Sequence, residues 1–253
     1  MIRIQRKDCP GCLNKPDNEF VKNDCKREEV KTTLLSMQHG KCCFCERKIS
    51  DLSATEREVE HYVPRSAFKD GNRKIQWRLA NKWENLLYSC RSCNSSKGWQ
   101  LPFNSTTNER EIIDPSCADD DPEDHIGFIV DDNLIYFAAQ NNSRLGKSTI
   151  EKLGFQGRGD LFGELRRIRL NIEQTIMELV NAYMSNDVAT VTSKTRELSR
   201  TTSAHHPFAS FKRKYIWKRV QQLNSESGRF EAMYGKPLGP IEVHINTGYD
   251  IEN

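Results

Sequence analysis

Two closely spaced pairs of cysteines constrain what this chain can fold into more than any other feature of its sequence. The first pair is Cys42 and Cys45, the second is Cys90 and Cys93, and 44 residues (46–89) lie between them. One tight turn can present two thiolates to a metal ion, and a closed tetrahedral zinc site needs four such ligands. The spacing therefore predicts a structural Zn2+ site, with coincidentally buried thiols as the alternative. Cys43 competes with Cys42 for one ligand position, and the two-residue spacing favours Cys42.

The composition is typical of a water-soluble protein whose cysteines stay reduced. The chain has 253 residues and a mean hydropathy of -0.73. Its apolar runs fall far short of the roughly 18 residues that a membrane span needs. The first residues, MIRIQRKD, lack the apolar segment of a secretion signal. We therefore expect a cytoplasmic protein without membrane contact, in which clustered cysteines bind metal rather than form disulfides.

The formal net charge of +3 conceals a strong separation of charge along the chain. Residues 65–100 contain eight basic and two acidic side chains, a net charge of +6. Residues 109–132 contain ten acidic side chains and one basic side chain, a net charge of -9. Positive charge returns in residues 144–170, with seven basic and three acidic side chains. This separation of charge suits a polyanion such as nucleic acid that contacts parts of both halves.

Hydrophobic periodicity predicts helices mainly in the second half of the chain. In residues 160–183 apolar side chains recur at steps of three and four behind Asp160, a residue suited to cap a helix. Shorter helices are predicted at 148–153, 193–200 and 207–223. The two apolar runs GFIV and LIYFAA, separated by Asp131, Asp132 and Asn133, predict a β-hairpin.

These patterns predict an α+β fold in two parts. We expect a first domain over residues 1–105 with its core at 42–98, followed by an acidic linker and hairpin over 106–140. A mainly helical domain is expected over 141–225, and an irregular tail, rich in glycine and proline, over 226–253.

The segment between and just after the cysteine pairs contains residues suited to hydrolysis of a phosphodiester. Such a reaction needs a base for the attacking water and a Lewis acid at the phosphate. His61 suits the base, and Glu60 and Asn94 offer oxygen ligands for a divalent cation such as Mg2+. Neighbouring side chains in a regular strand point to opposite faces. Glu60 and His61 can therefore act at one atom only if the strand ends or twists there, and the nearby Pro64 favours such an end.

The order of these motifs resembles that of the HNH endonuclease family. The matching motifs are Glu60-His61-x-x-Pro64, Asn85-Leu86 and Cys90-x2-Cys93-Asn94-x2-Lys97-Gly98, with Cys42-x2-Cys45 ahead of them. The resemblance implies a zinc-stapled ββα-metal core in which His61, Asn85 and Asn94 are catalytic, and Asn85 orients the segment that carries the base. It also makes Arg65 and Lys97 candidate contacts to nucleic acid. Members of the family often have Asp or His where this chain has Glu60 or Asn94, so the choice between Mg2+ and Mn2+ stays open.

Weaker similarity extends over roughly residues 1–220 to the PtuB-type HNH nuclease subunit of Septu anti-phage defence systems, including their retron-associated relatives. It is carried by MIRIQR, GKCCFCE, EHYVPRS and the acidic segment before a helical end. This resemblance implies a separate ATPase partner (PtuA-like), with a retron reverse transcriptase and its RNA-DNA hybrid in retron-associated systems. The helical half would then be the docking domain.

Two other functions fit the same motifs. One is a zinc-stapled nucleic-acid-binding module without catalysis, which has no reason to place Glu60, His61 and Asn94 together. The other is a stand-alone restriction-type HNH nuclease.

HNH chemistry acts on a phosphodiester and the basic segment recognises charge, so the sequence leaves open whether DNA or an RNA such as tRNA is cut.

Several residues outside these motifs have ordinary structural explanations. Cys9-x2-Cys12 could begin a second zinc site, but no matching pair exists, so Cys9, Cys12, Cys25 and Cys117 are expected to be free thiols. The tryptophans of the basic segment could stack on bases but are expected to fill a small core: Trp77, Trp83 and Trp99. The Gly146-Lys147-Ser148 segment lacks the first glycine of a phosphate-binding loop, since Asn141 stands there.

Overall fold

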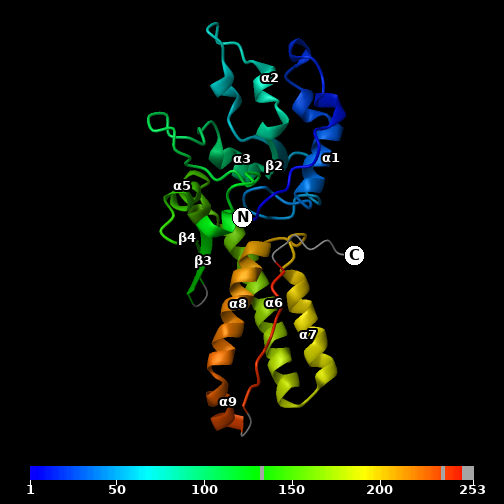
Figure 1. The fold of residues 1–253 in the computed structure, drawn as a ribbon, viewed down its shortest axis with the longest axis vertical. Helices are drawn as coiled ribbons and strands as arrows, with labels where there is room; N and C mark the ends of the chain where they lie inside the picture. The colour runs from blue at the N-terminus through cyan, green and yellow to red at the C-terminus, as the bar shows by residue number, and fades with distance from the viewer. Residues whose placement is uncertain (132–133, 235–236, 247–253) are drawn as a thin grey trace. The chain divides into compact units, whose positions relative to one another are not determined.

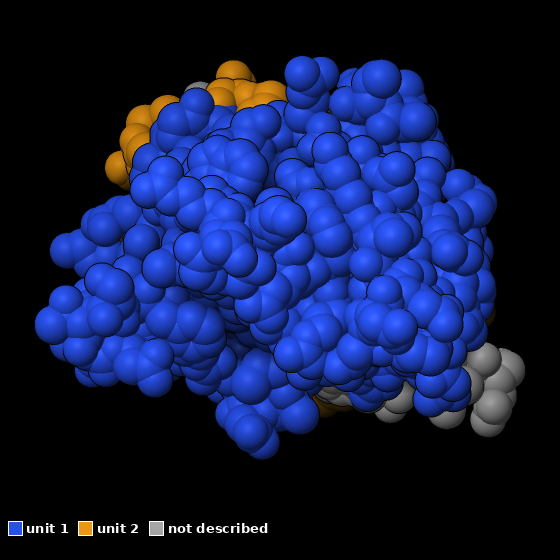
Figure 2. All heavy atoms as spheres, turned by 90° about the horizontal axis from the view of Figure 1, so that it is seen from above, with its two compact units in different colours: residues 1–127, 137–158 blue, residues 128–136, 159–253 orange. Residues whose placement is uncertain are grey.

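The computed structural model describes residues 1–131, 134–234 and 237–246 (Figure 1). The chain divides into two compact units, which Figure 2 colours separately. Unit 1 comprises Met1–Gly127 and Phe137–Arg158, and unit 2 comprises Phe128–Tyr136 and Gly159–Asn253. Both helices and small sheets are present, so the expected mixture of α and β structure is found.

Unit 1 combines short helices with a two-stranded sheet. Its helices are α1 (Glu28–Met37), α2 (Trp77–Ala80), α3 (Arg91–Lys97), α4 (Pro122–His125) and α5 (Arg144–Lys152). The sheet is formed by β1 (Arg57–His61) and β2 (Leu86–Cys90), which pair antiparallel. Short 3-10 helices precede α1 or lie after later elements: Gly11–Leu13, Asp17–Glu19, Asp24–Lys26, Arg65–Phe68, Trp83–Asn85 and Phe155–Gly157.

The sheet is supported along the edge of β2 that β1 leaves open. Gln38, directly after α1, donates from Nε2 to the carbonyl of Tyr88 at 2.7 Å and accepts from the Tyr88 N-H at 2.8 Å. The N-H of Cys43 also donates to the Tyr88 carbonyl, at 3.0 Å. These contacts satisfy backbone groups that an edge strand would otherwise expose, and they attach the first cysteine segment to β2.

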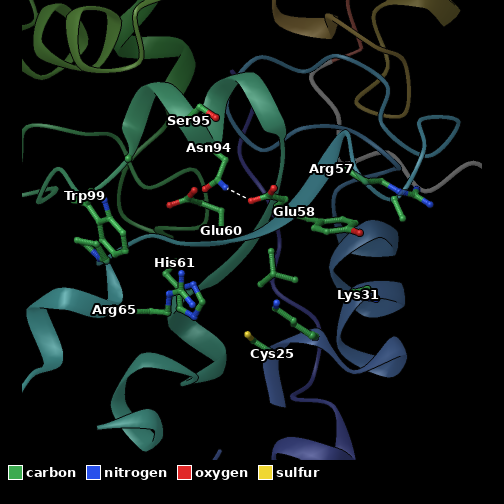
Figure 3. A pocket seen from close by; sticks show the side chains of 16 residues that line it. Cys25, Lys31, Arg57, Glu58, Glu60, His61, Arg65, Asn94, Ser95 and Trp99 are labelled. Atoms are coloured by element: carbon green, nitrogen blue, oxygen red, sulfur yellow. Dashed lines mark hydrogen bonds between the residues drawn. The ribbon is translucent and has the colours of Figure 1, made fainter. Parts of the chain in front are cut away.

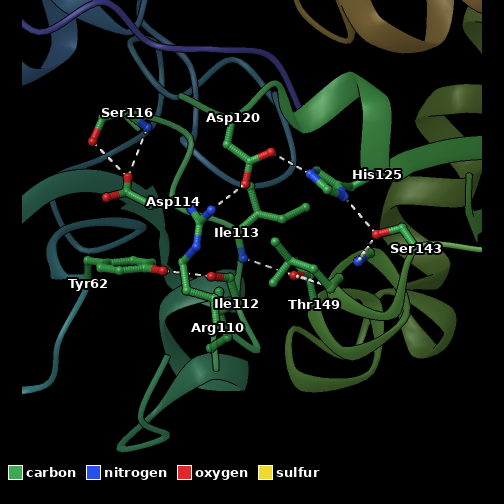
Figure 4. A network of polar contacts seen from close by, with 12 residues as sticks. Tyr62, Arg110, Ile112, Ile113, Asp114, Ser116, Asp120, His125, Ser143 and Thr149 are labelled. Carbon is green, nitrogen blue, oxygen red and sulfur yellow. Dashed lines mark hydrogen bonds and ion pairs between the residues drawn. The ribbon is translucent and has the colours of Figure 1, made fainter. Parts of the chain in front are cut away.

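Residues 106–127, the greater part of the expected linker over residues 106–140, are packed into unit 1, which contradicts a linker there. Ile112 and Ile113 within this segment are fully buried. The Tyr62 hydroxyl donates to the Ile112 carbonyl at 2.6 Å, and the Ile113 N-H donates to Thr149 Oγ1 at 2.9 Å (Figure 4). The charge count had indicated a solvated stretch, but two adjacent isoleucines supply enough apolar surface to hold it against the unit.

The acidic side chains of this segment have basic partners. Asp120 forms an ion pair with Arg110 at 2.9 Å and contacts His125 Nε2 at 2.5 Å (Figure 4). His125 Nδ1 in turn lies 2.7 Å from Ser143 Oγ, which caps α5. Lys152 and Glu111 pair at 3.1 Å. Arg144 also pairs with Glu109 at 2.8 Å. The net charge of -9 is therefore partly neutralised by Arg144 and Lys152, which lie outside residues 109–132.

The boundary of the helical part also differs from the expected one at residue 141, because α5 belongs to unit 1. The predicted helix at 148–153 begins earlier, since Ser143 accepts a hydrogen bond from the Gly146 N-H and caps the first turn. A Cβ built at Gly146 would lie 2.1 Å from the His125 carbonyl oxygen. Glycine is thus required here for close packing of backbone against backbone.

Unit 2 contains the long helices predicted from periodicity. α6 (Gly159–Met184) covers the segment predicted from residue 160, and α7 (Val188–Thr201) extends the prediction at 193–200. α8 (Ala209–Ser225) begins and ends two residues later than the predicted helix at 207–223. The buried face of α6 has the predicted spacing: Leu161, Leu165, Ile172, Ile176 and Leu179. α8 is attached to α6 by Arg219, which pairs with Glu173 at 2.8 Å.

The strands β3 (Ile126–Asp131) and β4 (Leu134–Ala139) pair at the place of the predicted hairpin. Residues 132 and 133 of its turn lie outside the described residues.

The expected irregular tail is wrong at its start, where α9 (Ser227–Tyr234) forms, because most of the glycines and prolines behind that expectation begin at position 235. Residues 237–246 have no helix or strand, and Leu238 and Ile241 are buried. Residues 247–253 of the predicted tail lie outside the described part.

Among the described residues, no helix has the length and apolarity needed to cross a membrane.

Packing of the acidic segment predicts a large cost for truncating Ile113. Ile113→Ala should lower the free energy of unfolding by about 2–5 kcal/mol, because a fully buried side chain leaves a cavity. Leu101→Ala removes the same number of carbons from a side chain that is 41% exposed, and should cost much less. Urea denaturation measures both variants. Equal, small losses would restore the interpretation of this segment as a solvated linker.

Candidate functional site

The four cysteines predicted to bind zinc lie together in unit 1. Their sulfur atoms all lie within 4.8 Å of one another, and the Cys45 and Cys90 sulfurs are 3.8 Å apart. Zinc bonded to four sulfurs at about 2.3 Å places those sulfurs about 3.8 Å apart, so the cluster has the size of a tetrahedral zinc site. Cys43 is buried beside it but does not belong to the group.

Local backbone structure brings each pair into the cluster. The first pair lies in a turn in which the Cys42 N-H donates to the Arg47 carbonyl at 2.9 Å and the Glu46 N-H donates to the Cys42 carbonyl at 3.1 Å. In the second pair, Cys90 ends β2 and Cys93 lies in the first turn of α3. The cluster therefore joins the turn at residues 42–47 to the junction of strand and helix.

The charges around the cluster favour a bound cation. Burial opposes ionisation of Cys42, but hydrogen bonds from the neighbouring thiols lower its pKa well below the usual value for cysteine. Hydrogen bonding to Cys42 raises the pKa of Cys45 and Cys93 well above that value. Arg158 donates to the Cys93 sulfur at 3.4 Å. Four sulfurs that cannot all ionise beside one another fit a site in which Zn2+ supplies the compensating charge.

Glu60, predicted to be a metal ligand, is buried, and only one of its two carboxylate oxygens has a partner among the described residues. Its Oε1 forms an ion pair with Lys97 Nζ at 2.7 Å, and its Oε2 has no hydrogen-bond partner among the described residues. Burial raises the pKa of Glu60 to about 7, although Lys97 acts in the opposite direction. An unpaired buried carboxylate oxygen is costly, and a divalent cation would both partner it and favour its ionised form.

Lys97 does not lie where a contact to nucleic acid requires it. Its side chain is fully buried, and Nζ donates to the His61 carbonyl at 2.9 Å in addition to pairing with Glu60. The last turn of α3 directs Lys97 toward β1 rather than to the surface. The prediction of a phosphate contact by Lys97 is therefore wrong, and the residue instead joins α3 to the end of β1.

His61, the predicted base, is the last residue of β1 and is 9% exposed. Its Nε2 lies 3.3 Å from Asn81 Oδ1, and Asn81 Nδ2 donates to the Val21 carbonyl at 2.9 Å. Because the Asn81 amide nitrogen donates to the Val21 carbonyl, the Asn81 amide oxygen faces the imidazole ring of His61. An oxygen accepts hydrogen bonds, so Nε2 of His61 carries the hydrogen and Nδ1 has a free lone pair. Burial lowers the pKa of His61 to about 4, which leaves the ring neutral at pH 7.

Asn85 holds the segment after His61 through backbone contacts. Its Oδ1 accepts from the Val63 N-H at 2.7 Å, while its Nδ2 donates to the carbonyls of Val63 at 3.1 Å and Ala80 at 3.0 Å. These three bonds connect the chain after β1 to the end of α2. The side chain therefore lies where it can orient the His61 segment, and it does not line the pocket described next.

A pocket of about 730 Å³ brings the remaining residues together (Figure 3). Glu60, His61 and Asn94 line it, with Arg65 half-buried nearby. The oxygens available for a divalent cation are Oε2 of Glu60 and the amide oxygen of Asn94, a donor type that fits Mg2+ or Mn2+.

Three residues near the pocket were missed or misread from the sequence. Asn81 and Glu58 do not belong to a recognisable sequence motif. Glu58 could have been found from its position two residues before Glu60, because that spacing puts both side chains on one face of a strand. Trp99 lines the pocket and is 69% exposed, so the expectation that it fills the core is wrong. Trp83 is buried as expected and donates to the Lys7 carbonyl at 2.9 Å.

The other cysteines do not form a second metal cluster within the described residues. Cys9, Cys12, Cys25 and Cys117 form no disulfide bond in the described part of the chain. Cys25 lines the pocket near His61 (Figure 3).

Comparison with known proteins identifies two similar curated proteins, both named Septu protein PtuB. The one from Bacillus mycoides (strain KBAB4) is 28% identical over 216 residues, which cover 72% of this chain and 71% of the relative. The one from Bacillus thuringiensis is 26% identical over 212 residues, covering 80% and 74%. No family model and no solved structure matches the chain. The resemblance to PtuB-type Septu proteins is thereby confirmed.

The four-cysteine cluster predicts that zinc content and stability are lost together. Cys90→Ser should reduce bound zinc from one ion per chain to none and lower the melting temperature, because a structural zinc contributes folding free energy. Zinc is measured by mass spectrometry of the purified protein and stability by thermal unfolding. The matched control is Cys43→Ser, a buried neighbour outside the cluster, which should retain the zinc. Loss of zinc from Cys43→Ser but not from Cys90→Ser would contradict the assignment.

Proposed function

We propose that this PtuB-like chain is a metal-dependent HNH endonuclease that hydrolyses phosphodiester bonds of nucleic acid as part of a Septu-type anti-phage defence complex. The observation that carries the proposal is the pocket of unit 1. It combines a neutral histidine, an unpartnered buried carboxylate oxygen and an asparagine amide, all beside the four-cysteine cluster.

The proposed chemistry begins with His61. Its Nδ1 lone pair accepts a proton from the attacking water, while Asn81 holds Nε2 and so fixes the tautomer. Asn85 keeps the segment after His61 in place through the backbone of Val63. A neutral histidine at pH 7 is the form that a general base requires.

Glu60 and Asn94 are the residues that would hold the divalent cation. When bound, the cation supplies a Lewis acid for the scissile phosphate and the leaving oxygen. Lys97 fixes the other oxygen of Glu60, so the carboxylate is held with Oε2 unpaired. Zn2+ at the four cysteines would keep Asn94 in place, because Cys93 is its neighbour in the first turn of α3.

Nucleic acid fits the charge and the surface of the same pocket. Four basic side chains contribute to its lining: Lys26, Lys31, Arg57 and Arg65. Arg65, four residues after His61 and half-buried, is the proposed phosphate contact. The exposed indole of Trp99 offers a surface on which a base can stack.

The chain is proposed to act with a PtuA-like ATPase, and with a retron reverse transcriptase and its RNA-DNA hybrid where the system is retron-associated. Support comes from the similarity to two Septu PtuB proteins. The helices of unit 2 are the proposed docking element, since none of them contributes a residue to the pocket.

The test of the nuclease is the substitution His61→Ala. Removal of a general base should reduce cleavage at least about 100-fold, while zinc content and the circular dichroism spectrum stay unchanged. Cleavage of DNA and RNA substrates is measured with Mg2+ or Mn2+ and after chelation of these ions. His205→Ala, which changes an exposed histidine, should cleave as the wild type does. Undiminished cleavage by His61→Ala would contradict the proposed mechanism, and binding without cleavage by the wild type would favour a binding module.

The test of the partner is co-expression of the chain with the ATPase encoded beside it. The two proteins should purify together, and removal of ATP from the isolated chain should leave its own cleavage unchanged. A chain that purifies alone and cleaves fully would instead indicate a stand-alone nuclease.

A further inference from the structure

The side chain of Asn94 forms a hydrogen bond with Glu58. Asn94 Nδ2 donates to Glu58 Oε2 at 2.5 Å, from the first turn of α3 to the middle of β1. Glu58 and Glu60 are two residues apart in β1 and so lie on the same face of the strand. Figure 3 shows the Asn94 side chain between these two carboxylates, with its nitrogen toward Glu58. The Asn94 amide therefore has a carboxylate on each side.

The contact decides which way the amide points. A carboxylate oxygen accepts hydrogen bonds, so the amide nitrogen and not the amide oxygen faces Glu58. The oxygen of Asn94 then lies at the other edge of the amide group, on the side of Glu60. An exchange of nitrogen and oxygen would turn the nitrogen toward Glu60 and the oxygen toward Glu58.

The other orientation would close the site to a cation. Glu60 Oε2 is buried and unpartnered, so a nitrogen turned toward it could donate a hydrogen bond and satisfy it. The amide N-H of Asn94 would then occupy the place that a divalent cation needs. Glu58 competes for the same nitrogen and keeps it away. What remains is the amide oxygen of Asn94 beside Oε2 of Glu60, which has no donor among the described residues, an arrangement that a cation stabilises.

We propose that Glu58 is a positioning residue, which orients the Asn94 amide so that its oxygen and Oε2 of Glu60 together bind the divalent cation. The inference rests on the proposed function, because it concerns the cation of that same site. It assigns to Glu58 an effect through Asn94 and not a bond to the metal. Partners that orient metal ligands in this way change metal affinity about 10–100-fold when removed.

The experiment measures Mn2+ binding to the full-length, zinc-loaded chain by isothermal titration calorimetry, without nucleic acid. Glu58→Ala should weaken Mn2+ binding about 10–100-fold, because the amide is then free to turn. Glu58→Gln should bind nearly as the wild type does, since its side-chain oxygen can still accept from Asn94 Nδ2. The matched control is Glu56→Ala, which removes an exposed carboxylate two residues away and should leave Mn2+ affinity unchanged. Zinc content and circular dichroism confirm that each variant is folded.

Three results would overturn the inference. Wild-type affinity in Glu58→Ala would mean that the contact does not orient Asn94. Equal losses in Glu58→Ala and Glu58→Gln would mean that the charge of Glu58 acts on the metal directly. Absence of Mn2+ binding by the wild type would remove the site itself.

Failure of the inference and failure of the proposed function leave different signatures. A wild-type chain that binds Mn2+ and cleaves nucleic acid, with Glu58→Ala unchanged in affinity, rejects only the role of Glu58. A wild-type chain that neither binds Mn2+ nor cleaves nucleic acid rejects the proposed nuclease as well.

Discussion

The four-cysteine cluster is the constraint on which the rest of unit 1 depends. It joins a turn near residue 42 to the junction between β2 and α3, so segments separated by 44 residues meet at one point. A sheet of two short strands is marginally stable in water by itself. Burial of β2 supports it from one side, and cross-linking through a metal can add to that stability. Because Cys93 precedes Asn94, the same cross-link also determines where the proposed cation ligand lies.

The buried ion pair between Glu60 and Lys97 is the second element of the site. Removing one member of such a pair leaves an uncompensated buried charge, at a cost of about 3–5 kcal/mol. Here the pair uses one oxygen of Glu60 and leaves the other without a partner among the described residues. Lys97 also binds the carbonyl of His61. One lysine therefore fixes both the carboxylate and the strand end that carries the histidine, which explains why it is buried.

The sequence predicted those features that have a short-range signal. Paired cysteines predicted the cluster, and regular apolar spacing predicted α6, because both patterns are complete within a few turns of chain. Contacts between distant residues were not predictable in this way. The burial of Lys97 depends on Glu60 across 36 residues, and the role of Asn81 depends on His61. The acidic segment was misread since charge was counted along the chain, whereas Arg144 and Lys152, from outside the segment, neutralise part of it in space.

Unit 1 is proposed to have two metal sites with different ligands, a closed sulfur site for zinc and an open oxygen site for a divalent cation. Anomalous diffraction from crystals soaked with Mn2+, measured at the zinc and manganese absorption edges, distinguishes the two sites. We expect a zinc peak among Cys42, Cys45, Cys90 and Cys93, and a separate manganese peak between Glu60 and Asn94. A manganese peak at the cysteines, or none at Glu60 and Asn94, would contradict this proposal.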